Sequence, residues 1–234
     1  MFISSDFDLR KSKIQITDAR IFHQIQKVLR MKKGEIIFLG DGHGQEAKAE
    51  IKVFGNKELW VQVLESFENT REPGTEITLY ISVLKKDKME WLAEKVTEAG
   101  VRNIVPLNSE RTVKLNLRYD RLRKIVLEAA EQSGRGIVPD IKEKMDLEEA
   151  LNEAKNTQDK NLFFDISGDK PSFDSLGGIS KKIGIFVGPE GGWSDKELSL
   201  ARNKDFPIVK MSDLTFRGET AGILATYLSF FVKI

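Results

Sequence analysis

The sequence contains no cysteine and only two histidines among its 234 residues. Without cysteine, the protein can form neither a disulfide nor a thiolate metal site, and this composition fits a reducing cytoplasm. Neither His23 nor His43 belongs to a recognisable metal-ligand motif. We therefore expect no metal centre.

Long apolar segments are also lacking. The first residues, MFISSDFDLRKSK, do not contain the apolar core of a signal peptide. The longest apolar run, residues 221–232, is shorter than the roughly 20 residues that a membrane span requires, and Gly222, Thr226 and Ser229 interrupt it. We expect a soluble, cytoplasmic protein with no membrane partner.

The chain has little excess charge, because its formal net charge is only +1. Its charges are unevenly distributed, however. Residues 1–34 contain eight basic and three acidic residues, and seven basic residues lie between Arg102 and Lys124. Two basic zones on a nearly neutral chain indicate an anionic partner such as a phosphate backbone, although solvated helix faces give the same pattern.

The first part of the chain reads as a small β-barrel that carries basic residues. Strands are predicted at 35–39, 47–54 and 59–64, with glycine-containing turns between them. Before these strands, Thr17 and Asp18 can cap a short helix that extends to Leu29. Pro73 and Gly74 lie in the best linker, residues 68–75, so the first domain is predicted to span residues 1–70.

The rest of the chain alternates predicted strands and helices. Residues 77–84 form an almost continuous apolar run, which is typical of a strand covered on both faces. A helix with apolar residues from Met89 to Ala99 ends at Gly100. Further elements are predicted at 101–107, 120–133, from Asp146 (capped with Glu149) to Ala154, and at 162–166. This order predicts an α/β domain with a mainly parallel sheet at residues 75–234.

Residues 183–198, IGIFVGPEGGWSDKEL, are the most distinctive stretch of the sequence. The opening IGIFV predicts a short buried strand. Three glycines in the following GPEGG permit backbone angles that are closed to other residues, and Ser194 with Glu197 matches a capping box that begins a helix. Such a turn offers bare backbone amides to a ligand, although an ordinary connecting loop can look the same.

A second loop of this kind lies near the end of the sequence. PIVKM at 207–211 predicts a short strand, SDLTFRGETA follows at 212–221, and an apolar helix is expected to continue to the last residue. Loops that each leave a strand and enter a helix would lie side by side at one edge of a parallel sheet. Ligands of such folds bind at that edge.

The motifs VGPEGG at 187–192 and RGETA at 217–221 together resemble the ribosomal RNA uridine-N3 methyltransferase family that acts on small-subunit (16S) RNA. The resemblance extends through KVTEAGV at 95–101, SER at 109–111 and EAAEQSGR at 128–135, and includes His23 with VLR at 28–30. It covers nearly the whole chain. It implies a SPOUT methyltransferase domain with a parallel sheet and a C-terminal trefoil knot, preceded by a PUA-like RNA-binding barrel.

The resemblance also implies a cofactor. Proteins of this family bind S-adenosylmethionine through three loops of the knot and transfer its methyl group directly to uracil N3, without a metal. Here those loops follow the strand at 162–166, contain the glycines, and span 211–216. The residues expected to bind the cofactor are Phe164, Asp165, Gly188, Pro189, Glu190, Gly191, Gly192, Met211, Ser212, Leu214 and Phe216.

Catalysis would require stabilisation of a deprotonating uracil. A cationic donor near the base favours the anion, and Arg217, with Glu219 beside it, is our first choice; alternatively, the two form an ion pair that holds the loop. Glu190 could orient the glycine loop or act as a base. The residues expected to bind 16S RNA or the small ribosomal subunit are Arg10, His23, Arg30, Arg111, Gln132 and Arg135. For Gln132 and Arg135, helix capping and surface exposure are the alternative.

The sequence departs from the family where Met211 and Ser212 replace the usual Leu-Gly, and at Leu214, where the family commonly has a basic or small residue. A non-catalytic RNA-binding protein with a degenerate cofactor loop is therefore one alternative. A nucleotide-binding enzyme unrelated to methylation is another, weakened by the lack of a phosphate-loop lysine motif or a strand-linked GxGxxG. The C-terminal segment is more apolar than one buried face needs, and the resemblance implies a homodimer whose active site uses both chains.

Overall fold

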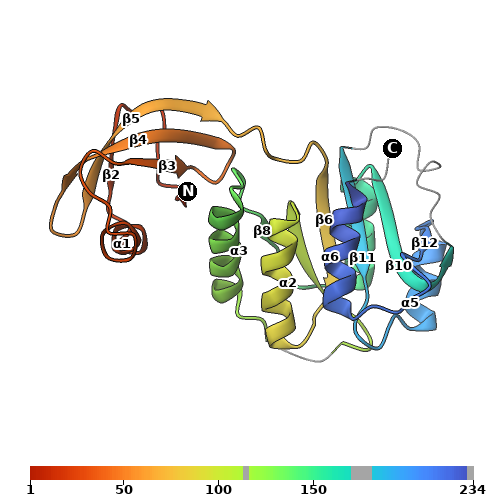
Figure 1. Ribbon diagram of the computed structural model, residues 1–234. Coiled ribbons are helices and arrows are strands. Elements are labelled where there is room, and N and C mark those ends of the chain that lie inside the picture. The colour runs from red at the N-terminus through yellow and green to blue at the C-terminus, as the bar shows by residue number, and fades with distance from the viewer. Residues whose placement is uncertain (113–115, 170–180, 231–234) are drawn as a thin grey trace. The chain divides into compact units, whose positions relative to one another are not determined.

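The computed structural model describes residues 1–112, 116–169 and 181–230. Packing divides the chain into two units, one of Met1–Glu72 with Ala130–Val138 and one of Pro73–Ala129 with Pro139–Ile234 (Figure 1). The segment Ala130–Val138 lies within the predicted second domain in sequence and packs with the first unit. No helix in the described ranges is long and apolar enough to span a membrane.

The first unit is built on a five-stranded sheet in the order β1-β3-β4-β5-β2. β1 pairs with β3 in parallel, and the other pairs are antiparallel. Its elements are β1 (Phe2–Ile3), β2 (Lys13–Ile16), helix α1 (Ala19–His23), the π-helix η1 (Gln24–Val28), β3 (Ile36–Gly40), β4 (Gln45–Phe54) and β5 (Leu59–Glu68). Two register shifts between β4 and β5 mark bulges, which bend a sheet. Asp18 caps α1 as predicted, accepting from the backbone N–H groups of Arg20 and Ile21.

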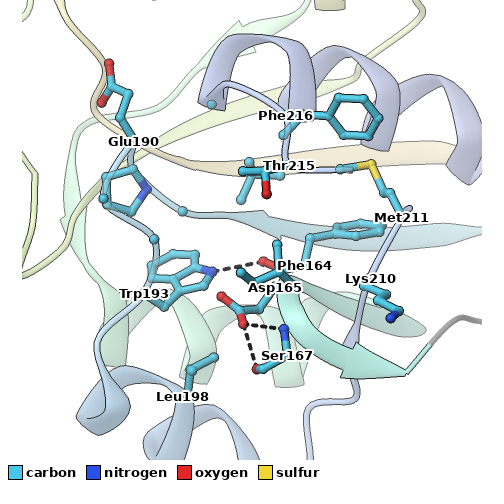
Figure 2. Close-up of a pocket in the computed structure, with 18 of the residues that line it drawn as sticks. Phe164, Asp165, Ser167, Glu190, Trp193, Leu198, Lys210, Met211, Thr215 and Phe216 are labelled. Atoms are coloured by element: carbon cyan, nitrogen blue, oxygen red, sulfur yellow. Dashed lines mark hydrogen bonds between the residues drawn. The ribbon is translucent and has the colours of Figure 1, made fainter. Parts of the chain in front are cut away.

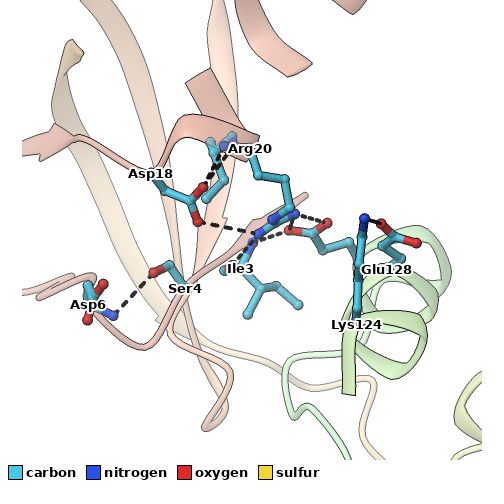
Figure 3. Close-up of polar contacts among 9 residues, drawn as sticks. Ile3, Ser4, Asp6, Asp18, Arg20, Lys124 and Glu128 are labelled. Carbon is cyan, nitrogen blue, oxygen red and sulfur yellow. Dashed lines mark hydrogen bonds and ion pairs between the residues drawn. The ribbon is translucent and has the colours of Figure 1, made fainter. Parts of the chain in front are cut away.

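Buried charged groups fix the segment Ala130–Val138 within the first unit. Glu131 accepts a hydrogen bond from the backbone N–H of Ile3 at 2.7 Å and two from Nη1 of Arg20, at 2.7 and 2.9 Å (Figure 3). Arg135 donates to Glu72 at 2.7 Å. The first unit therefore contains a piece of chain that is more than 50 residues from the rest of it in sequence.

The second unit contains a parallel sheet in the order β12-β10-β11-β6-β7-β8, with β9 pairing beside β7. Its strands are β6 (Glu76–Ser82), β7 (Asn103–Asn108), β8 (Asp140–Ile141), β9 (Met145–Asp146), β10 (Lys160–Asp169), β11 (Lys182–Val187) and β12 (Ile208–Val209). Its helices are α2 (Lys86–Glu98), α3 (Tyr119–Ser133), α4 (Leu147–Thr157), α5 (Asp195–Asn203) and α6 (Gly218–Ser229). The last four residues of α3 belong to the first unit.

Helices cover both faces of this sheet. On one face, α4 and α5 pack over Tyr80, Phe163 and Phe186, whose rings stack across three neighbouring strands. On the other face, α2 and α6 lie side by side (Figure 1). They approach so closely that a Cβ atom on Gly222 would lie 2.7 Å from Cδ1 of Leu92. The apolar run of β6 is buried because helices cover it on both sides, as predicted.

Two helix starts differ from the sequence-based predictions. Asp146 precedes α4, but its side chain does not cap the helix, because its Oδ1 accepts a hydrogen bond from Asn108 instead. Helix α6 begins at Gly218, so most of the RGETA motif lies in its first turn rather than in the preceding loop. The predicted extension of the last helix over residues 231–234 lies outside the described residues.

Candidate functional site

A cavity of about 450 Å³ lies at the carboxyl ends of three neighbouring strands, β12, β10 and β11 (Figure 2). A bulge of β10 and the loops that follow β11 and β12 enclose it. Ligand sites of parallel sheets commonly occupy this position. All residues predicted to bind the cofactor line the cavity, namely Phe164, Asp165, Gly188, Pro189, Glu190, Gly191, Gly192, Met211, Ser212, Leu214 and Phe216.

The glycine loop, residues 188–192, lies against the indole ring of Trp193. A Cβ atom on Gly188 would lie 3.1 Å from both Cε2 and Nε1 of that ring. Trp193 is 4% exposed, and its Nε1 donates a hydrogen bond to the carbonyl oxygen of Phe164 at 3.1 Å (Figure 2). Gly192 has a φ of 69°, in the left-handed region that glycine favours. The loop therefore presents bare backbone beside a fixed aromatic ring.

Three side chains hold the C-terminal end of the glycine loop. Ser194 and Glu197 form the predicted capping box at the start of α5, and Glu197 also accepts from the backbone N–H of Glu110 at 2.9 Å. Nη1 of Arg111 donates to the carbonyl oxygens of Gly191 at 2.7 Å and Trp193 at 3.2 Å. Arg111, which we predicted to bind RNA, thus lines the cavity and supports its wall.

The predicted loop after Asp165 is a bulge within β10. The register of β10 against β12 shifts between Phe164 and Asp169, so the intervening residues leave the ladder, and three of them, Asp165, Ile166 and Ser167, line the cavity. Inside the bulge, Oδ1 of Asp165 accepts from the backbone N–H of Ser167 at 2.9 Å and from its Oγ at 2.6 Å. A Cβ atom on Gly168 would lie 2.6 Å from the backbone of β12, so the strand rejoins the sheet at a glycine.

The third wall of the cavity is the loop after β12. Oγ of Ser212 accepts from the backbone N–H of Leu214 at 3.1 Å, which forms a local turn. Arg30 and Asp205 are the non-glycine residues with positive φ in the described chain, so Ser212 does not need a glycine-like angle. The substitution of Ser212 for glycine is compatible with the loop.

The two residues predicted to be catalytic do not line the cavity. Arg217 is exposed at the N-cap of α6, and Glu219 is buried in the first turn of that helix. In the described structure, Glu219 pairs with Lys88 at 3.3 Å rather than with Arg217. Nζ of Lys88 also donates to Glu190 at 3.2 Å. This hydrogen bond and the nearby Glu219 carboxylate raise the pKa of the Lys88 ammonium above its usual value.

The predicted RNA-binding residues are not gathered at one place. Arg10, His23, Arg30 and Gln132 are exposed on the first unit. Arg10 donates to Asp8 at 3.0 Å. Arg135 is only 6% exposed, and its guanidinium is bonded to Glu72. Its burial and this ion pair favour a structural role for Arg135, and RNA binding by this residue stays a prediction.

The cavity also contains residues that sequence reasoning missed. They include Ile166, Ser167, Trp193, Leu198, Lys210 and Thr215. Trp193 could have been found, because it directly follows the glycines and is the only aromatic residue in that loop. Lys88 does not line the cavity but donates to Glu190, which does. No sequence signal points to Lys88, since it is more than 100 residues from Glu190. No group of three or more potential metal ligands occurs in the parts of the chain that the structure describes.

Two family models match the chain. An RNA methyltransferase domain matches residues 70–229, and an RNA methyltransferase PUA domain matches residues 16–64. A protein named ribosomal RNA small subunit methyltransferase E from Rickettsia conorii is 29% identical, covering 92% of this chain and 88% of its own length. A protein of the same name from Aquifex aeolicus is 34% identical, over 70% of this chain and 72% of its own.

Solved structures agree with these matches. A ribosomal RNA small subunit methyltransferase E from Neisseria gonorrhoeae, bound to S-adenosylmethionine, superposes with a TM-score of 0.89 at 28% identity. The match covers 99% of this chain and 97% of that one. A protein from Legionella pneumophila, also in complex with S-adenosylmethionine, gives a TM-score of 0.85 at 26% identity, over 97% of this chain and 95% of its own.

Proposed function

Because this chain belongs to the RNA methyltransferase family, we propose that it methylates N3 of a uridine in 16S ribosomal RNA. It is an S-adenosylmethionine-dependent methyltransferase of small-subunit ribosomal RNA, in agreement with relatives named ribosomal RNA small subunit methyltransferase E and with a structural neighbour of that name bound to S-adenosylmethionine. The uridine and its N3 atom are the proposed part. The resemblance of the VGPEGG and RGETA motifs to the family supports that part, and the cavity at the ends of β10, β11 and β12 is the observation that carries the cofactor site.

The residues around the cavity fit S-adenosylmethionine. Its volume of about 450 Å³ lies within the range of pockets that hold small ligands. Phe164, Trp193 and Leu198 provide an apolar wall, and the glycine loop offers backbone donors and acceptors. At Gly188, a side chain would fill the space in front of the indole ring. The cavity therefore suits a nucleoside with polar edges.

The cofactor supplies a methyl group on a positively charged sulfur, and methylation of N3 releases the proton of that nitrogen. This chain would bind the two reactants, exclude water and stabilise the negative charge on the uracil. We assign the last role to Arg217, whose exposed guanidinium lies at the start of α6, immediately after the cavity wall. Glu219 would set the position of that helix turn through its pair with Lys88.

We further propose a trefoil knot in the second unit, a homodimer and a cytoplasmic location, with no metal in the reaction. The family resemblance supports the knot. The apolar side of α6 supports the homodimer, because Ile223, Leu224 and Leu228 are only partly covered and Tyr227 is 52% exposed. The exposed residues Arg10, His23, Arg30 and Gln132 would bind the RNA.

Calorimetric titration with S-adenosylmethionine tests the site. We expect the wild-type protein to bind and Gly191→Arg to lose binding, because the new side chain would grow from the cavity wall beside Arg111. Gly74→Arg is the matched control, since a Cβ atom there meets nothing within 4 Å and Gly74 lies outside the cavity. Equal binding by wild type and Gly191→Arg would contradict the assignment.

The non-catalytic alternative rests on Met211 and Ser212, and the observed backbone removes the objection to Ser212. The non-catalytic alternative still predicts a different result in this experiment. A folded wild-type protein that binds RNA but not S-adenosylmethionine would favour it over the enzyme.

A further inference from the structure

We infer that Lys88 is a positioning residue that joins two walls of the cavity, an inference that rests on the proposed function. Its ammonium lies 3.2 Å from Oε1 of Glu190 and 3.3 Å from Oε2 of Glu219. Glu190 belongs to the glycine loop, and Glu219 to the first turn of α6. These three residues are called the Lys88 bridge below. Lys88 itself comes from the first turn of α2.

The Lys88 bridge lies where the same two walls already meet. A Cβ atom on Gly218 would lie 2.8 Å from Cδ2 of Leu84 and 3.6 Å from the carbonyl oxygen of Gly188. Leu84 precedes α2 in the chain, so the glycine loop, the start of α6 and the segment before α2 converge at one point. Gly188, Glu190 and Gly218 line the cavity. A small shift at this point therefore changes the shape of the cavity.

The charges of the Lys88 bridge explain why the lysine is needed. The side chain of Glu219 is 10% exposed, and its buried Oε2 accepts no hydrogen bond in the described structure. A buried carboxylate without compensation is costly, and Lys88 supplies the opposite charge. Without the ammonium, the carboxylates of Glu190 and Glu219 would face each other and repel. The repulsion would separate the glycine loop from α6.

The test compares S-adenosylmethionine affinity, measured by calorimetry, in wild type and variants. We expect Lys88→Met to raise Kd about 10-fold, because a charge-assisted contact is lost from a site that is partly exposed to water and therefore partly screened. Lys88→Arg should restore most of the affinity. In the Lys88→Met background, adding Glu219→Gln should recover part of the loss, because it removes the repulsion.

Lys95 provides a matched control on the same helix. Its ammonium also lies between two carboxylates, 2.9 Å from Glu94 and 2.9 Å from Glu98, but neither of these carboxylates lines the cavity, whereas Glu190 does. Lys95→Met should leave Kd unchanged. If Lys88→Met does not fold, Glu190→Gln, which weakens the bridge on its exposed side, must raise Kd.

The outcomes separate the two proposals. Wild-type protein that binds the cofactor, with Lys88→Met binding equally well, would overturn the inference and leave the proposed function intact. An equal loss in Lys95→Met, or no rescue by either Lys88→Arg or Glu219→Gln, would also overturn it. No binding by wild type would overturn the proposed function and this inference together.

Discussion

Replacing Gly188 with alanine places a methyl group against Trp193. The new Cβ would lie 3.1 Å from Nε1 and Cε2 of the indole and 3.2 Å from Cδ2, closer than ordinary van der Waals contact. The ring has little freedom to move. It donates a hydrogen bond to Phe164 and packs against Phe163, with 4.6 Å between the ring centroids. Either the glycine loop or the indole must shift.

The expected loss of affinity can be estimated from the cost of that shift. Forcing an extra methyl group into a packed site costs about 1–3 kcal/mol, and losing the Trp193 hydrogen bond costs about 1 kcal/mol. Because the strained atoms form the cavity wall, we expect S-adenosylmethionine to bind about 10-fold more weakly, which corresponds to about 1.4 kcal/mol. A loss of stability of that size should also lower Tm by about 3–6 °C in a chain of this length.

Calorimetric titration and thermal denaturation measure these effects, with Gly191→Ala as the control in the same loop. A Cβ atom on Gly191 would lie 3.4 Å from Cβ and Cδ of Arg111, which is an ordinary contact, and neither glycine has a positive φ. Gly191→Ala should therefore bind almost as well as wild type. Equal effects of the two substitutions, or an unchanged Kd in Gly188→Ala, would refute the steric reasoning.

Two further predictions concern stability. Glu131→Gln should lower the free energy of unfolding by about 2 kcal/mol, less than for a fully buried ion pair because the side chain of Arg20 remains 28% exposed. Glu128→Gln, which affects an exposed pair at 3.8 Å on the same helix, should change the free energy of unfolding by less than about 0.5 kcal/mol. Denaturant unfolding measures both changes, and a larger loss in Glu128→Gln than in Glu131→Gln would contradict this prediction. Glu90 has a pKa below its usual 4.5, chiefly because Arg121 donates to it. The contribution of this pair to the stability of the folded state is therefore present above about pH 4.5 and is lost as the pH falls through the lower pKa of the folded state. The fall in Tm below pH 4.5 should be shallower in Glu90→Gln, and an identical pH profile would show that this pair contributes nothing.

Local signals in the sequence located the cavity. Alternating strand and helix patterns, together with the glycine turn and the capping box at Ser194, predicted a parallel sheet with a site at one edge. The structure contains the parallel sheet and the capping box. These features depend on residues that are close in sequence, so pattern and spacing can detect them. The residues inside the cavity followed from the resemblance, because periodicity says nothing about which loop residues face a ligand.

Long-range pairing could not be predicted in this way. Arg135, beside the end of a helix, is predicted to read a base or a phosphate, and the sequence gives no sign of its partner Glu72, which is 63 residues away. Asp146 was expected to cap α4, but Asn108 competes for its carboxylate. In each case a distant polar partner contacts a side chain whose local sequence pointed elsewhere.

The most direct test of the account is the identity of the methylated nucleoside. Small ribosomal subunits that lack the modification would be incubated with the wild-type protein and S-adenosylmethionine carrying a labelled methyl group. The 16S ribosomal RNA would then be digested and its nucleosides analysed by mass spectrometry, with Gly191→Arg as the inactive control. The account predicts labelled 3-methyluridine with wild type and none with the variant. Label on a ribose, on a carbon atom of the base, or on no nucleoside of 16S RNA would contradict it.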